Sequence, residues 1–251
     1  MWKKFLVGFA ILLCIQIVVA EETPWKGEGE LGITQTTGNT ENQNVIAKLE
    51  LTHEQDSWKH KAKLEALRTE DEEKLTAERY EFKWKTDYKL SELSYVFGKL
   101  RYEEDKFTGY NYQASLSTGY GYKVFDTDID SLDLEAGIGV RTFELEGEVT
   151  DDSEKSEFVG LKLESESEQE AIVTFALAYT RKIGANTKFT QDFLVEAGSE
   201  NIYSKSDTGL KVSMTDRLAL KLSLLVKNNS EVAADKEKTD MISAVTLVYS
   251  F

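Results

Sequence analysis

The sequence is poor in the residues on which several classes of protein depend. Its 251 residues include one cysteine, Cys14, and one proline, Pro24, so a disulfide scaffold is excluded. Only the first twenty residues approach the apolar run of roughly 20 that a spanning helix needs, which excludes a polytopic helical membrane protein. Basic residues are also scarce, 30 Lys and Arg against 45 Asp and Glu, for a net charge of −15. Phosphate contacts need a basic surface, so nucleic acid is not an expected partner.

Residues 1–20 have the features of a secretory signal peptide. Two lysines precede an apolar stretch, and Ala20 offers a small residue before cleavage at Glu21. A retained membrane anchor is the alternative, but the run is short and acidic residues follow it. Cys14 is not preceded by the small residue that a lipoprotein signal needs. We therefore expect an exported chain whose residues 21–251 form one outer-membrane barrel domain.

From residue 25 onward the dominant hydrophobic period is two. Between Tyr110 and Val124 one parity is apolar and aromatic while the other is small and polar, and the alternation returns further along the chain. Such alternation predicts half-buried strands. Twelve are expected, at 25–35, 42–53, 58–69, 75–88, 92–103, 110–124, 131–143, 170–182, 187–198, 203–214, 218–228 and 239–251. Short connectors alternate with longer, more charged ones, as in outer-membrane barrels.

Two measures favour a membrane barrel over a soluble β-sandwich. The predicted girdle residues are Tyr110, Tyr112, Tyr120 and Tyr122, two pairs ten residues apart. At about 3.3 Å per residue and a tilt of roughly 40°, the pairs are separated by about 25 Å, the height of the apolar band of such barrels. Most of the outward-facing sets of residues also lack charged side chains. A Lys or Arg on the lipid-facing side would cost about 2–4 kcal/mol at the bilayer midplane. Arg79, Lys99 and Arg101 fit this pattern least well and predict a bulge or a shifted register.

The chain ends on an aromatic residue of the outward parity. The alternating set is Val245, Leu247, Tyr249 and Phe251. We expect the barrel-assembly machinery to bind this strand as an insertion signal. The alternative is a buried edge strand of a soluble sheet.

Several short motifs resemble a known family. They are Gly27-Glu28-Gly29-Glu30-Leu31-Gly32 followed by Thr37-Gly38-Asn39-Thr40, then Asp105-Lys106-Phe107-Thr108-Gly109-Tyr110, Gly119-Tyr120-Gly121-Tyr122 and Gly137-Ile138-Gly139-Val140-Arg141. Over most of residues 22–251 the chain is similar to the salt-induced outer-membrane proteins, a β-barrel family of unknown function. The resemblance implies an outer-membrane barrel of a Gram-negative bacterium, with an envelope role or an association with salt or osmotic stress. It brings no catalytic or ligand-binding residues with it.

The sequence offers little from which an active site could be built. The only histidines, His53 and His60, flank a short turn on the outward parity, where interfacial packing is a better explanation than catalysis or metal binding. No phosphate loop, metal spacing or nucleophile motif is present. In the acidic stretch 144–170, Asp151, Asp152 and Glu154 are candidates for a divalent-cation rim facing lipopolysaccharide, although a solvated loop is the simpler interpretation. We predict no enzymatic activity, no cofactor and no resident metal.

Inward positions carry charges of both signs. The predicted lumen-lining residues are Glu28, Glu30, Lys48, Glu50, Lys61, Lys63, Glu81, Asp133 and Arg141. The expected cross-strand pairs are Glu30–Lys48, Glu50–Lys61 and Lys63–Glu81, each contributing about 0.2–1 kcal/mol. Eight strands leave a filled interior and sixteen leave a channel, so twelve permit either a salt-bridged plug or a narrow polar pore.

Together these patterns predict an all-β protein: a single transmembrane antiparallel up-and-down barrel of about twelve strands. Its expected partners are outer-membrane lipid and lipopolysaccharide, and its oligomeric state is open. Its expected role is a non-enzymatic envelope protein with a narrow or plugged lumen. A porin-like channel for small solutes or ions is one alternative, which conductance would distinguish. A soluble periplasmic β-protein binding an apolar ligand is another, which urea washing of membranes would distinguish.

Overall fold

The chain forms a closed antiparallel barrel. The computed structural model describes residues 25–37, 42–71, 74–105, 110–145, 167–232 and 236–251. Its strands are β1 (Trp25–Thr37), β2 (Asn42–Gln55), β3 (Trp58–Asp71), β4 (Lys74–Lys89), β5 (Ser94–Asp105), β6 (Tyr110–Asp126), β7 (Asp130–Leu145), β8 (Ser167–Ile183), β9 (Thr187–Ala197), β10 (Ile202–Ser213), β11 (Leu218–Asn229) and β12 (Thr239–Ser250). Each strand pairs with its chain neighbours, and β12 pairs with β1 to close the sheet. The predicted twelve-stranded up-and-down barrel is confirmed. Within the described ranges, no helix has the length and apolar character to cross a membrane.

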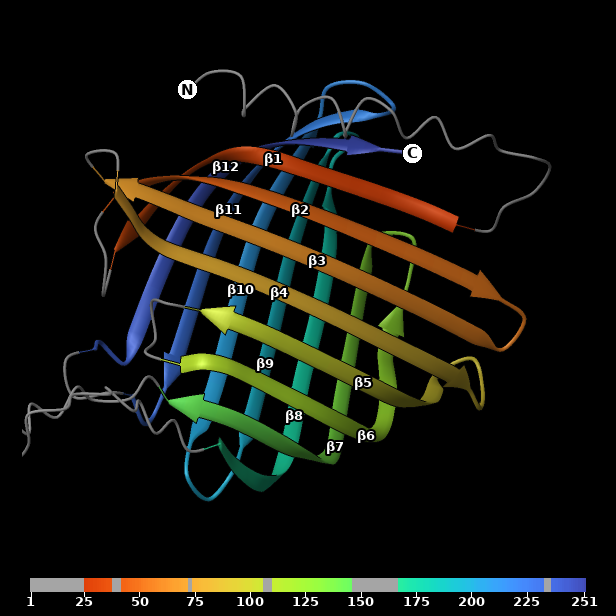
Figure 1. Cartoon of the computed structure of the whole chain (residues 1–251). Coiled ribbons are helices and arrows are strands. Elements are labelled where there is room, and N and C mark those ends of the chain that lie inside the picture. The colour runs from red at the N-terminus through yellow and green to blue at the C-terminus, as the bar shows by residue number, and fades with distance from the viewer. Residues whose placement is uncertain (1–24, 38–41, 72–73, 106–109, 146–166, 233–235) are drawn as a thin grey trace, which may run out of the picture.

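The barrel is flattened into two walls that cross one another (Figure 1). Strands β2 to β5 run across the front, and β9 to β11 run behind them at a steep angle. The turns 56–57, 90–93, 127–129, 184–186 and 214–217 gather at one end of the barrel, which we call the short-turn end. The inward side chains of the two walls therefore face each other across the lumen.

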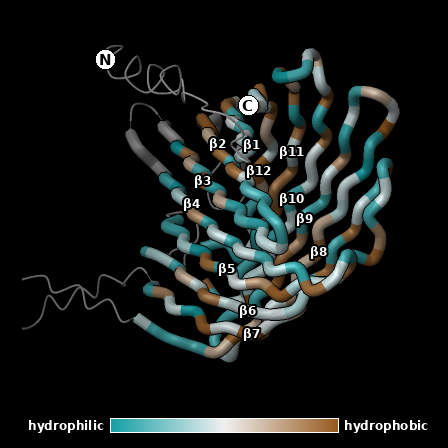
Figure 2. Tube along the Cα trace, turned by 90° about the vertical axis from the view of Figure 1, so that its right-hand side faces the viewer, coloured by the Kyte–Doolittle hydropathy of each residue, from teal (hydrophilic) through white to brown (hydrophobic). Residues whose placement is uncertain are grey.

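The interior of the barrel is polar and its exterior is apolar. Among the described residues, 23 buried side chains are polar or charged and 13 are apolar. Outward positions such as Leu116, Ile138 and Val173 are exposed, and the alternation is visible along each strand in Figure 2. A small apolar cluster inside the barrel contains Ile46, Leu67, Leu225, Ile242 and Ala244. This arrangement inverts that of a soluble domain, in which apolar side chains fill the core.

The predicted bulge or shifted register occurs in the strands that carry the three basic residues, but not at the residues themselves. The pairing of β4 with β3 shifts between Thr69 and Glu70, and that of β5 with β6 shifts between Glu103 and Asp105. Strands β4 and β5 pair in continuous register through Arg79, Lys99 and Arg101. All three side chains follow the inward parity, and Arg79 and Arg101 are fully buried. An inward charge needs no bulge to avoid lipid, so the alternation is undisturbed.

The girdle prediction was wrong for one tyrosine. The pairing of β6 with β7 shifts between Tyr110 and Tyr112, and a shift of one residue moves a side chain to the other face of the sheet. Tyr110 therefore points inward and is only 2% exposed, while Tyr120 and Tyr122 lie exposed on the outside. Tyr112 stacks on Tyr102 of the neighbouring strand, with ring centres 6.2 Å apart.

Two of the three predicted cross-strand pairs were out of register. Glu30 does lie opposite Lys48, but Glu50 lies opposite Lys63, and Lys63 lies opposite Lys83. For Glu50 the cause is turn length, because a two-residue turn at Asp56 and Ser57 shifts the β2–β3 pairing by two residues relative to a four-residue turn. The β3–β4 pairing, which decides the partner of Lys63, has its own register shift between Thr69 and Glu70. The corrected pairings are thus Glu50–Lys63 and Lys63–Lys83 rather than Glu50–Lys61 and Lys63–Glu81.

Candidate functional site

Ion pairs join opposite walls of the barrel. Lys205 of β10 lies 2.6 Å from the Glu81 carboxylate of β4. Lys227 of β11 forms ion pairs with Glu103 and Asp105 of β5. In a ring of twelve, β4 and β10 are six strands apart, as are β5 and β11, which is the largest separation possible. The side chains of the two walls therefore meet in the middle of the lumen.

These pairs belong to a larger cluster, which we call the transluminal lock. Its members are Glu65, Arg79, Glu81, Arg101, Glu103, Asp105, Glu196, Lys205 and Lys227. All nine side chains are buried. Burying charges is costly unless each finds opposite charge and hydrogen bonds, so the lock is stable only as a complete network.

Arg101 lies at the centre of the lock. Its Nη2 donates to Glu196 Oε2 at 2.6 Å, and its Nη1 donates to Glu103 Oε2 at 2.9 Å. The guanidinium carbon lies 4.2 Å from the centre of the Tyr203 ring. Ser115 donates a further hydrogen bond to Glu196 at 2.9 Å. One arginine thus links β5, β9 and β10 through groups that have no access to water.

A second layer of polar contacts lies in the lumen further from the short-turn end. Arg141 Nε donates to Glu170 Oε1 at 3.0 Å, and the same guanidinium also donates to the Asn201 carbonyl. Asn201 in turn donates from its side-chain amide to Asn229 Oδ1 at 2.8 Å. The Tyr110 hydroxyl donates to the Glu231 carbonyl at 2.7 Å. The segment around Asn201 is therefore fixed to the lumen wall.

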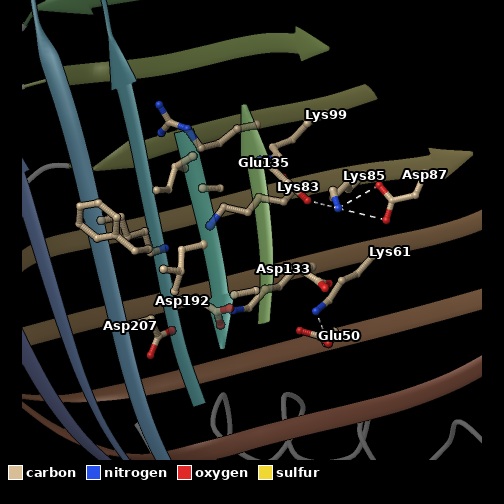
Figure 3. Close-up of a pocket in the computed structure, with 18 of the residues that line it drawn as sticks. Glu50, Lys61, Lys83, Lys85, Asp87, Lys99, Asp133, Glu135, Asp192 and Asp207 are labelled. Atoms are coloured by element: carbon tan, nitrogen blue, oxygen red, sulfur yellow. Dashed lines mark hydrogen bonds and ion pairs between the residues drawn. The ribbon is translucent and has the colours of Figure 1, made fainter. Parts of the chain in front are cut away.

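The short-turn half of the lumen is open and holds a cavity of about 450 Å³. Along β3 the exposed fraction of the inward side chains falls from 45% at Lys61 to 21% at Lys63 and 1% at Glu65. Arg101 and Lys205 of the lock form its inner end. We call this blind cavity the vestibule; Figure 3 shows its charged lining.

The predicted lumen-lining residues divide among these layers. Glu50, Lys61, Lys63 and Asp133 line the vestibule. Glu28 pairs with Lys211 at 2.6 Å, and Glu30 pairs with Lys221 at 2.8 Å. Lys48 lies 3.8 Å from Asp207. Glu81 belongs to the lock, and Arg141 belongs to the second layer. The ion pair Lys61–Glu50 is present at 2.8 Å despite the corrected register, because it runs diagonally.

Most residues of the lock were not predicted from the sequence. Arg79, Arg101, Glu196, Lys205 and Lys227 were not among the predicted lining residues. Their inward parity was readable, but their partners lie about 14 to 124 positions away in the chain. Such pairs become visible only once the curvature that brings opposite walls together is known.

Both histidines lie in an aromatic belt at the short-turn end. The His53 and Trp25 ring centres are 4.7 Å apart, and those of Trp58 and Tyr88 are 4.8 Å apart. His60 Nδ1 lies 3.0 Å from Thr86 Oγ1. The contacts are those of interfacial packing. In the described part of the chain no group of three or more His, Cys, Asp or Glu side chains is arranged to hold a metal.

The C-terminal strand lies at the seam of the barrel. Val245, Leu247, Tyr249 and Phe251 are all exposed on the outer face. The Phe251 amide donates to the Gly27 carbonyl at 2.9 Å, and the Gly27 amide donates back at 2.8 Å. The terminal residue thus takes part in closing the sheet. The proposed signal peptide, residues 1–20, and the acidic candidates Asp151, Asp152 and Glu154 lie outside the described residues.

Residues 29–251 match the family model described as protein of unknown function, DUF481. The chain belongs to this family. It is 25% identical over 228 residues to the uncharacterized protein YdiY of Escherichia coli (strain K12), which covers 90% of this chain and 83% of that protein. Membership of a family of unknown function is confirmed. The designation as salt-induced stays a prediction.

Solved structures of similar shape are membrane barrels. The NanC porin is similar with a TM-score of 0.53 at 9% identity, covering 88% of this chain and 98% of that one. The translocator domain of autotransporter NalP from Neisseria meningitidis gives a TM-score of 0.51 at 9% identity, covering 99% and 96%. At these identities the likeness shows the fold alone, which this DUF481 member shares with outer-membrane barrels.

Proposed function

We propose that this chain is a non-enzymatic envelope protein of the Gram-negative outer membrane whose barrel is closed to solute flow. The observation that carries the proposal is the transluminal lock. Lys205–Glu81 and Lys227–Glu103 connect strands at opposite points of the ring. The contact between these side chains and their burial support a lumen that lacks a wide aqueous path through its middle.

The outer-membrane location is supported by the surface and by the closure of the sheet. Inside hydrocarbon every backbone polar group needs an internal partner, and among β structures only closed barrels provide one. The exposed apolar outer face and the aromatic belt at the short-turn end match the band and girdle of such barrels. The association with salt or osmotic stress rests on the sequence resemblance alone and remains a prediction.

Single-channel conductance in planar bilayers tests the closed lumen. We expect the purified wild-type barrel to insert without stable current steps. The double variant Arg101→Ser/Glu196→Ser removes a charge pair across the lumen together with its bulk, so it is expected to produce discrete openings. Lys61→Ser/Glu50→Ser is the matched control, since it removes an ion pair between neighbouring strands at the open mouth, and should stay silent.

The porin-like alternative is favoured by one feature, the water-accessible vestibule. It predicts ohmic current steps from the wild-type barrel, of a size similar to those of the lock variant. That result would overturn the closed lumen and make the vestibule one mouth of a continuous pore.

A further inference from the structure

Rows of like charge line the front wall of the vestibule. The rows across β3, β4 and β5 are Lys61–Lys85–Lys99 and, one step deeper, Lys63–Lys83–Arg101. Members of a row lie directly opposite one another in the sheet register. Like charges in such positions destabilise a sheet. Strand pairing therefore gives no reason for two consecutive rows of cations.

The opposite wall repeats this pattern at the mouth. Its row crosses β8 to β11 as Lys182–Lys188–Lys211–Lys221. These residues share the inward parity, and Lys211 and Lys221 reach Glu28 and Glu30 inside the barrel. A solute entering from the short-turn end thus passes between lysine rows on both walls.

Most of these lysines have a carboxylate partner, yet cations predominate among the side chains that line the cavity. Lys61 pairs with Glu50, Lys63 with Glu65, Lys83 with Glu81 and Lys85 with Asp87. Glu135 is shared by Lys85 and by Lys99, the latter at 3.2 Å. Within the described ranges, Lys59 and Lys188 have neither an ion pair nor a hydrogen-bond partner. The cavity lining contains eight basic and six acidic residues, whereas the whole chain carries a net charge of −15. The cavity lining therefore has two more basic than acidic residues, in a protein that is acidic as a whole.

We propose that the vestibule binds a small multivalent oxyanion, a molecule with two or more phosphate or carboxylate groups, that enters from the short-turn end. Its volume of about 450 Å³ falls in the range of small-molecule sites. A cleft with one sign of charge and low-dielectric walls concentrates ions of the opposite sign. Because the lock ends the cavity, the anion is held rather than conducted. This ligand goes beyond the closed-barrel function proposed above.

The geometry assigns the main contacts to the front wall. Lys83 and Lys85 belong to adjacent inward positions of β4, one in each lysine row. Figure 3 shows the Lys83 side chain extending into the cavity and Lys85 between Glu135 and Asp87. Lysine ammonium groups suit phosphate and carboxylate as mobile point charges. Each ammonium group has three N–H donors. Lys83 and Lys85 can therefore donate to an incoming oxyanion while they keep their ion pairs with Glu81 and Asp87.

Isothermal titration calorimetry on the full barrel in detergent at low ionic strength tests the proposal. The probes are inorganic tripolyphosphate and citrate, which separate a phosphate from a carboxylate preference, and neutral maltotriose is the blank. We expect one saturable site for at least one anion. Lys83→Gln/Lys85→Gln should weaken its binding at least tenfold. Arg181→Gln/Arg217→Gln should change it less than twofold, because these side chains are exposed at the same end but do not line the cavity.

The closed barrel is verified for each variant by its heat-modifiable migration on gels. If the Lys83/Lys85 variant does not fold, Lys61→Gln/Lys99→Gln replaces it with the same expected loss. Absence of saturable binding to the folded wild type overturns the proposal, as does an equal loss in the arginine control. Neither result affects the closed lumen, whose readout is conductance.

Discussion

At the scale of single residues, the lumen depends on arginine. Arg79, Arg101 and Arg141 are fully buried. Arginine presents five donors in a planar fork, so Arg101 serves Glu196 and Glu103 at the same time. A lysine in its place would offer no such fixed geometry. Each carboxylate of the lock is therefore stable because it shares a guanidinium or ammonium group with another.

Removing one member of the buried lock should destabilise the barrel far more than removing one member of an exposed ion pair. We expect Arg101→Met to lower the free energy of unfolding by about 3–5 kcal/mol, because it leaves the buried Glu196 carboxylate without its ion pair and Glu103 with Lys227 alone. Arg101→Met/Glu196→Gln should recover part of that loss, since one of those charges is then gone. Denaturant unfolding of the refolded barrel in lipid vesicles measures both values as a double-mutant cycle.

The control for this cycle is the exposed pair Lys89–Glu54 at the short-turn end. Surface ion pairs are worth about 0–1 kcal/mol, so Lys89→Met should have little effect. If Arg101→Met is no more destabilising than Lys89→Met, the lock does not stabilise the barrel.

At the scale of the strand, the sequence contained most of the fold. Strands this long follow from an uninterrupted period of two, and their predicted bounds lie within three residues of those observed. Two errors arose where local backbone geometry decides the outcome. The tight turn at Asp56, which has a φ of 52°, set the β2–β3 register, and the shift beside Tyr110 reversed its side chain. Neither feature alters the hydrophobic pattern, so neither could be predicted from it.

The inward faces of β6 and β7 carry glycines near their middle for a steric reason. A Cβ at Gly119 would lie 2.2 Å from the Ala136 carbonyl oxygen, and one at Gly137 would lie 2.4 Å from the Thr118 carbonyl oxygen. The Tyr95 ring of β5 occupies the space above Gly121. Glycine in a strand often marks a bend or a close approach of backbone. Here it allows the wall to turn between the front and back of the flattened barrel.

Substitution of these glycines should therefore depend on which face they occupy. Gly119→Val is expected to prevent folding or to lower the melting temperature strongly, because the added methyl groups meet fixed backbone. Gly98→Val is the matched control, since a Cβ at Gly98 has nothing within 4 Å and valine favours strands. Circular dichroism during heating measures both. Equal melting temperatures would show that the close approach is relieved at no cost.

At the scale of the whole molecule, charge is enclosed and apolar surface faces outward. The lock could not be predicted from the sequence, because Lys205 and Glu81 are 124 residues apart and meet only in a flattened ring. The alternation in the sequence shows which residues of each strand point inward, but it does not show how far apart the opposite walls lie. Soluble monomers rarely expose contiguous apolar patches above a few hundred Å², and here outward apolar residues occur on nearly every strand. Lipid is the natural cover for such a surface.

Membrane integration gives the decisive test of this arrangement. After expression of the full chain in a Gram-negative host, we expect the protein to remain in the outer-membrane fraction through a wash with concentrated urea, because an apolar outer face is held by hydrocarbon rather than by peripheral contacts. The matched variant Leu116→Asp/Val140→Asp puts charge on adjacent outward positions of β6 and β7, which lie opposite each other. Charge at the midplane is unfavourable, so this variant should be lost from the membrane or degraded. Release of the folded wild-type monomer into the urea supernatant would contradict this prediction. It would mean that the protein is soluble although lipid does not cover its apolar exterior.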